Sequence, residues 1–137
     1  MTEFELIRTF FARQDVSRPD VVAGIGDDAA LLHPPAGQLL AVTSDLLVSG
    51  VHFLPDVNPF TLGHKALAVN LSDLAAMGAE PAWFLLNLTL PKADARWLEP
   101  FCRGMFQLAK EHNVQLVGGD TSRGPLAIAI EAHGFVP

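Results

Sequence analysis

Carboxylates recur in this sequence at four places where an apolar segment ends or is interrupted: Asp27 with Asp28, Asp45, Asp73 and Asp120. Neither Asp27 nor Asp28 has a basic neighbour in the chain that could neutralise its charge. Magnesium favours octahedral oxygen coordination and is usually held by one or two carboxylates together with substrate phosphates. Four separate sources of carboxylate therefore suit two or more magnesium ions, provided that the fold gathers them.

Hydroxyl groups and glycines next to these carboxylates extend the predicted chemistry. Thr43 and Ser44 directly precede Asp45 and offer hydroxyl or carbonyl oxygens as further ligands. The glycines of residues 24–26 and 118–119 leave backbone N–H groups open to phosphate oxygens. Neither segment has the spacing of a P-loop or of a dinucleotide-binding loop, so those two readings fail.

Each of these residues also has an ordinary structural explanation. A single aspartate at a strand end, such as Asp27 or Asp120, often forms a turn. Asp73 differs, because caps do not occur in the middle of a helix and a carboxylate on a buried helix needs a partner. His52 is either a surface residue or a substrate contact, and Arg123 is either a solvated turn residue or a phosphate contact. These alternatives stay open at the level of sequence.

Apolar spacing and capping residues predict three helices that position these groups. A short amphipathic helix is expected over residues 3–13, with a capping box formed by Thr2 and Glu5. A second helix begins after Asn58 with Pro59 and ends near Gly78; it is apolar nearly all round and is expected to be buried. A third helix is capped by Asp94 and carries the single cysteine, Cys102, as a buried thiol.

Strands are expected over residues 21–25, 29–33, 38–43, 82–90, 114–117 and 126–136. Asp45 then follows the end of the third strand, and Asp120 follows the end of the fifth. Because strand ends on one edge of a sheet converge, we expect these carboxylates to meet at that edge. Asp73 would join them from the second helix, which is expected to pass beneath the edge. The order α-β-β-β-α-β-α-β-β predicts an α+β fold, a mixed sheet with helices packed on one face.

Composition narrows the class of protein. A chain of 137 residues, half of them hydrophobic, is long enough for one domain with a proper core. A net charge of −6 with only 9 basic residues argues against a nucleic-acid partner. One cysteine excludes an internal disulfide framework and a cysteine-based zinc site, and favours a cytoplasmic location. No membrane span or export signal is expected.

Four sequence motifs, in this order along the chain, are more specific than the residue types alone: GIGDDAALL, TSDLLVSGVHF, KALAVNLSDLAAMGAEPAW and LVGGDTSRG. Together they resemble the N-terminal domain of the thiamine-monophosphate kinases, a family of the aminoimidazole ribonucleotide synthetase-like superfamily. The resemblance covers essentially the whole chain. It implies ATP-dependent phosphorylation of thiamine monophosphate to thiamine diphosphate, with Mg²⁺ as cofactor and a homodimer whose N-terminal sheets join into a barrel.

The resemblance also implies roles for individual residues. Two or more Mg²⁺ ions would be held by carboxylates and their neighbouring oxygens: Asp28, Thr43, Ser44, Asp45, Asp73 and Asp120. His52 would contact thiamine monophosphate, and Gly119 with Asp120 would face ATP. The roles of Asp27 and Arg123 are left undefined.

The family's chains carry a second domain beyond the region that resembles this sequence. We therefore expect residues 1–137 to be a metal-binding, ATP-binding and dimerisation domain with little activity alone. One alternative is a non-catalytic dimerisation module that binds divalent ions. Another is a sister enzyme such as a selenophosphate synthetase, although such enzymes place a reactive cysteine or selenocysteine near the N-terminus, whereas Cys102 lies in the third predicted helix.

Overall fold

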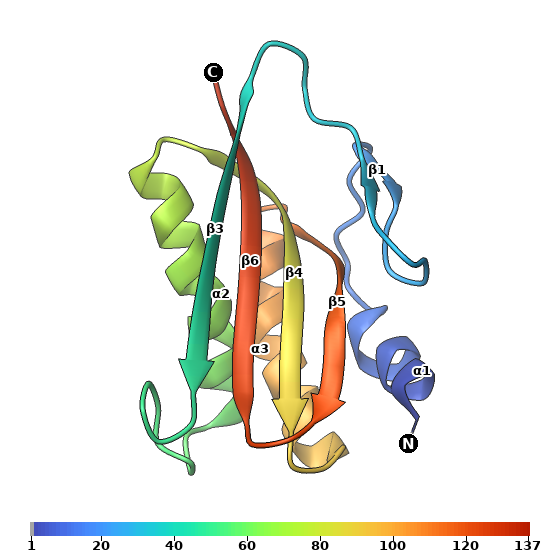
Figure 1. The fold of residues 1–137 in the computed structure, drawn as a ribbon, viewed down its shortest axis with the longest axis vertical. Helices are drawn as coiled ribbons and strands as arrows, with labels where there is room; N and C mark the ends of the chain where they lie inside the picture. Colours follow the sequence, from blue (N-terminus) through green and yellow to red (C-terminus); the bar gives the residue numbers. More distant parts are fainter. Residues whose placement is uncertain (1) are drawn as a thin grey trace.

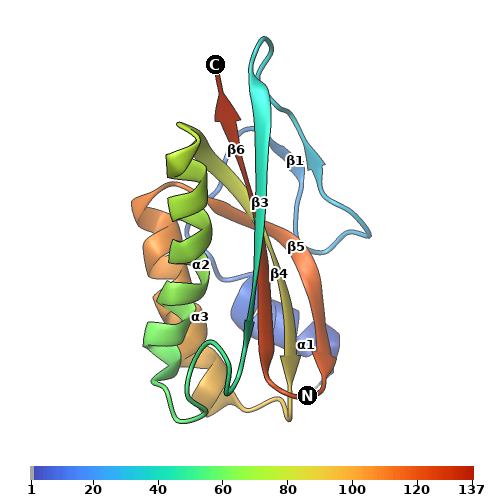
Figure 2. The same cartoon turned by 60° about the vertical axis from the view of Figure 1, so that its left-hand side comes forward.

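A four-stranded mixed sheet with two long helices on one face forms the body of the structure, a computed structural model that describes residues 2–137 (Figures 1 and 2). The strand order is β3-β6-β4-β5, in which β4 and β5 are parallel and the other neighbours are antiparallel. These strands are β3 (Leu39–Val48), β4 (Glu80–Leu90), β5 (Gln115–Arg123) and β6 (Ala127–Val136), and the two helices are α2 (Pro59–Ala76) and α3 (Ala95–Glu111).

The N-terminal part of the chain forms a further layer, which contacts both α3 and the side of the sheet away from α2 (Figure 2). A short helix α1 (Glu3–Leu6) continues as a single π-helical turn η1 (Ile7–Phe11), and β1 (Val21–Ala23) pairs with β2 (Leu31–Leu32) as a two-stranded ribbon. The ribbon lies on the side of the sheet away from α2, where its apolar side chains pack against a small buried cluster around Trp83 and Val117.

The main core lies between the sheet and the two long helices. Alternate residues of β6 and β4 point toward the helices and are buried, as the period of two along a strand requires: Leu86, Leu88, Leu90, Ile128, Ile130 and Ala132. The other face of β3 remains open, and Leu40, Val42 and Leu46 on it are 48%, 53% and 56% exposed. The two long helices therefore cover one face of the sheet, and the outer face of β3 is uncovered among the described residues.

Two glycines set the distance between α2 and α3. A Cβ atom on Gly63 would overlap the carbonyl oxygen of Phe101, and one on Gly104 would overlap the carbonyl oxygen of Phe60. The two backbones therefore approach more closely than side chains would permit. Gly63 and Gly104 are both buried at this reciprocal contact.

Side chains from residues 14–20 fasten the N-terminal layer to the edge of the sheet. The Gln14 amide donates to the carbonyl of Leu116 at 2.7 Å and accepts from its N–H at 2.8 Å, which substitutes for a neighbouring strand along β5. Arg18 donates two hydrogen bonds to Asp20, at 3.0 and 2.8 Å, and the indole N–H of Trp83 donates to the same carboxylate at 2.9 Å. This network holds the segment that leads into β1.

The structure confirms the predicted fold class and the order of helices and strands. Asn58 and Asp94 cap α2 and α3 as expected, and Thr2 and Glu5 exchange both hydrogen bonds of the capping box. Among residues 2–137, no helix is both long and apolar enough to cross a membrane.

Three expectations about the elements were wrong. The strand expected over residues 38–43 continues as β3 to Val48, so Asp45 lies inside a strand rather than beyond its end. The strand expected over residues 114–117 continues as β5 to Arg123, so Asp120 also lies inside a strand. The helix α2 is buried along one side only, and Asp73 is exposed on the other.

Candidate functional site

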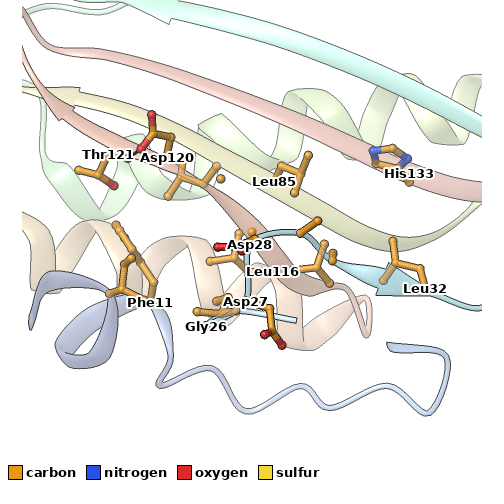
Figure 3. Close-up of a pocket in the computed structure, with 18 residues that line it drawn as sticks. Phe11, Gly26, Asp27, Asp28, Leu32, Leu85, Leu116, Asp120, Thr121 and His133 are labelled. Carbon is orange, nitrogen blue, oxygen red and sulfur yellow. Dashed lines mark hydrogen bonds between the residues drawn. The ribbon is translucent and has the colours of Figure 1, made fainter. Parts of the chain in front are cut away.

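A pocket of about 600 Å³ lies between the acidic turn after β1, the turn η1 and the outer face of β4 and β5. Asp27, Asp28 and Asp120 all line it, together with apolar side chains such as Phe11 and Leu85 (Figure 3). In Figure 3 the Asp27 carboxylate points away from Asp120, whereas Asp28 lies on the side of the turn nearer to Asp120. The pocket therefore joins two of the predicted carboxylate segments that are far apart in the sequence.

Gly119 shapes the wall of this pocket. Its φ of +135° lies outside the range that residues with a side chain readily adopt, and a Cβ there would overlap the carbonyl oxygen of Leu86. The adjacent Asp120 accepts a hydrogen bond from the N–H of Thr121 at 3.0 Å, and its side chain is exposed to the pocket. Glycine is thus required where β5 passes the pocket.

A second carboxylate group lies between β3 and α2. Thr43 donates a hydrogen bond from Oγ1 to Oδ2 of Asp73 at 3.3 Å. Burial, a hydrogen bond with Asp73 and the charge of Asp73 together raise the pKa of Asp45 above its ordinary value. Ion pairs to Asp45 or Asp73 are absent from the part of the chain that the structure describes. These two carboxylates therefore repel each other unless a proton or a cation lies between them.

The two carboxylate groups do not meet within one chain. Asp120 is in register with Asn87, Ala129 and Leu46, which places it on the outer face of the sheet. Asp45 is in register with Ile130, which places it on the face that α2 covers. Over residues 2–137, no group of three or more histidine, cysteine, aspartate or glutamate side chains is close enough to hold one metal ion.

The expectation that one sheet edge gathers all the carboxylates was therefore wrong for a single chain. Its premise was that Asp45 and Asp120 follow the ends of their strands. Both lie inside strands, and β3 and β5 are the two outer strands, with β6 and β4 between them. Ser44 is also separated from Thr43, because it is in register with Glu131 on the exposed side of the sheet.

His52 lies in the loop that follows β3. Its Nδ1 accepts a hydrogen bond from the N–H of Val48 at 2.9 Å, so the neutral ring carries its proton on Nε2. The side chain is exposed, and the Nε2–H group is available as a donor. Arg123 is exposed at the end of β5.

His133 and Glu131 are site residues that the sequence reasoning missed. His133 lines the pocket, and its Nε2 lies 3.4 Å from Oε1 of Glu131 on the outer face of β6. The alternation of residues 127–136, which puts Ile128 and Ile130 on the inner face, was the signal that could have placed both side chains outside.

Comparisons with known proteins match this arrangement to a family. Residues 26–136 match the family described as AIR synthase related protein, N-terminal domain. The chain belongs to this family. The matched range begins at the acidic turn and includes β2 to β6 with both long helices, so all the predicted site residues of the AIR synthase related domain fall within it.

Proteins similar to this domain include thiamine-monophosphate kinases. Over 135 residues, 98% of the chain, it is 58% identical to the thiamine-monophosphate kinase of Escherichia coli K12 and spans 42% of that protein. The crystal structure of thiamine-monophosphate kinase from Stenotrophomonas maltophilia K279a is similar to this structure, with a TM-score of 0.87 and 54% sequence identity. The match covers 99% of this chain and 43% of the Stenotrophomonas chain. A structure described as AaThiL complexed with AMPPCP and TMP is also similar, with a TM-score of 0.71 and 31% sequence identity. The match covers 97% of this chain and 40% of the AaThiL chain.

These matches confirm the resemblance inferred from the sequence motifs. They also show that the AIR synthase related domain spans less than half the length of the curated relatives it matches.

Proposed function

We propose that a protein containing this domain transfers the γ-phosphoryl group of ATP to thiamine monophosphate and forms thiamine diphosphate. The observation that carries the proposal is the 58% identity to a thiamine-monophosphate kinase over 98% of the chain. The relative described as complexed with AMPPCP and TMP supports ATP and thiamine monophosphate as substrates. The pocket beside Gly119 and Asp120 is the candidate ATP site.

Magnesium fits the donor sets of both carboxylate groups. Asp28 and Asp120 face one pocket, and Asp45 with Asp73 and the Thr43 hydroxyl form the other set. The raised pKa of Asp45 indicates a place where a cation would relieve repulsion between carboxylates. Magnesium held by these residues would supply charge neutralisation for the nucleotide phosphates.

The chain's own residues then bind and orient the substrates. The backbone of Gly119 is exposed at the pocket, where a phosphate would approach it, and Nε2–H of His52 would donate a hydrogen bond to thiamine monophosphate. Because the acceptor oxygen belongs to an anionic phosphate, the reaction needs no strong general base. Positioning and charge neutralisation supply most of the catalysis.

A second copy of the domain is part of the proposal. The outer face of β3 leaves Leu40, Val42 and Leu46 about half exposed, at 48%, 53% and 56%. An open apolar sheet face of this kind supports a homodimer in which two sheets pack together. The partner, with the rest of the longer protein, would complete the site that the separated carboxylates leave unfinished. We also propose a cytoplasmic location and little activity for residues 1–137 alone.

The activity is tested in the full-length protein by following ATP-dependent formation of thiamine diphosphate during a magnesium titration. The Asp73→Asn variant should lose at least roughly tenfold in turnover and need more magnesium, as expected when a metal ligand is removed. Asp15→Asn is the matched control, because Asp15 pairs with Lys110 on the surface, away from both carboxylate groups. Unchanged magnesium-dependent turnover in Asp73→Asn would favour a non-catalytic dimerisation module.

A further inference from the structure

The loop that carries His52 is built as a closed turn. The N–H of Ser49 donates to the carbonyl of Leu126 at 3.2 Å, and the N–H of Gly50 donates to the carbonyl of Phe53 at 2.8 Å. Phe53 is 9% exposed and anchors the end of the turn in the core. The loop is therefore ordered from both ends, and the exposed His52 lies between these anchors.

Lys65 adds one contact from outside the loop. Its Nζ donates a hydrogen bond to the carbonyl oxygen of His52 at 2.9 Å from the exposed side of α2. None of the ion pairs of residues 2–137 involves Lys65, so its ammonium group has no carboxylate partner among these residues. A charged donor makes a stronger hydrogen bond to a carbonyl than a neutral donor does.

Hydrogen bonds thus restrict both the imidazole ring and the backbone carbonyl of His52. Val48 N–H fixes Nδ1 of the ring, and the Lys65 ammonium fixes the carbonyl of the same residue. Together they define the direction in which Nε2–H points away from the end of β3. Releasing the carbonyl would free the peptide that joins His52 to Phe53 and would broaden the range of ring positions.

We infer that Lys65 is a positioning residue for substrate binding, which acts by fixing the backbone of His52 so that its Nε2–H meets thiamine monophosphate. The inference rests on the proposed function, because it assumes that His52 contacts this substrate. Lys65 itself need not touch the substrate. Its effect should fall on thiamine monophosphate and leave ATP binding unaffected, since the ATP pocket lies across the sheet on β5.

The test uses the full-length protein with Lys65→Met, Lys65→Arg and His52→Asn, and Lys92→Met as control. Lys92 is exposed between β4 and α3, and no hydrogen bond of residues 2–137 joins its side chain to the His52 loop. Steady-state kinetics should show the KM for thiamine monophosphate raised roughly tenfold in Lys65→Met, because a less preorganised His52 would bind this substrate about 1.4 kcal/mol more weakly. The KM for ATP, kcat and the melting temperature should stay close to the wild-type values.

Two further results separate positioning from a general structural effect. Lys65→Arg should recover most of the affinity for thiamine monophosphate, because a guanidinium group can still donate to the carbonyl. Adding Lys65→Met to His52→Asn should have little further effect, because both changes act through the same imidazole.

The opposite results would overturn the inference about Lys65: an unchanged KM for thiamine monophosphate in Lys65→Met, an equal rise in the KM for ATP, or additive effects with His52→Asn. If Lys65→Met melts early, Lys65→Leu, which likewise lacks a donor, is measured in its place against the same criteria. Failure of the proposed function looks different. Wild-type protein would then form no thiamine diphosphate, or His52→Asn would bind thiamine monophosphate as well as wild type.

Discussion

Asp45 on β3 lies close to Asp73 on α2, although 28 positions separate them in the sequence and the ion pairs of residues 2–137 supply neither with a cation. Thr43, two residues before Asp45 on the same face of β3, donates a hydrogen bond to Asp73. A strand and a helix thus present two carboxylates and a hydroxyl group at one place. Such a group costs stability when it is empty and gains it when a cation binds.

Replacing Asp45 with asparagine should stabilise the fold in magnesium-free buffer at pH 7. The folded-state pKa of Asp45 lies above its ordinary value of 3.8, so the stabilising protonated form is present at low pH and is lost as the pH rises through the folded-state pKa. Asp45→Asn should therefore gain about 0.5 kcal/mol in unfolding free energy at pH 7, allowing for solvent screening, and nothing below pH 3.8. Urea unfolding at both pH values measures this difference. Added magnesium should stabilise the wild type more than the variant; equal stabilisation would contradict the assignment.

Replacing Asp20 with asparagine should destabilise the fold at pH 7, the opposite of the effect expected for Asp45→Asn. Burial raises the pKa of Asp20, but hydrogen bonds from Arg18 and Trp83 and the charge of Arg18 more than offset it, and the pKa lies below 3.8. The contribution of Asp20 is therefore present above pH 3.8 and is lost as the pH falls through the folded-state pKa. Asp20→Asn should cost about 2 kcal/mol at pH 7 because Arg18 loses its charged partner.

The loss in Asp20→Asn should shrink as the pH falls below 3.8, because the unfolded wild type then takes up a proton that the folded carboxylate resists. Urea unfolding at pH 7 and near pH 2.5 gives the comparison, with Asp15→Asn as the control, since the Asp15–Lys110 pair is exposed. A loss that stays constant with pH would point to a packing effect of the substitution.

Adding one methyl group to Gly63 should separate α2 from α3. The new Cβ would overlap the carbonyl oxygen of Phe101, which belongs to the backbone of α3 and cannot swing aside as a side chain could. Gly63→Ala should cost about 3 kcal/mol of unfolding free energy through overpacking. His64→Ala, at the next and exposed position of the same helix, should change it by less than about 0.5 kcal/mol. Thermal and urea unfolding of the two variants provide the measurement.

The thiol of Cys102 should be unreactive until the protein unfolds. Cys102 is 5% exposed, and burial raises its pKa to about 12. Since the thiolate is the reactive form, a disulfide reagent such as DTNB should modify the native protein far more slowly than the protein in urea. A fast reaction in native buffer would show that α3 opens locally at this residue.

Local signals in the sequence were sufficient to predict where the helices begin. Asn58, Asp94 and the Thr2–Glu5 pair each form a hydrogen bond within a few residues, so helix starts could be predicted from neighbours in the chain. Strand ends were harder to predict. Gly118-Gly119 resembles a turn, yet β5 continues through it because Gly119 meets the backbone of β4 at Leu86, a contact between distant segments.

The sequence by itself determined the order of the elements, the caps of the helices and the family to which the chain belongs. Only the tertiary structure decided that Asp120 and Asp45 lie on opposite faces of the sheet. The face of a strand residue depends on its register with partners that are distant in the sequence, and a shift of one residue reverses it. Periodicity within one segment carries no information about that register.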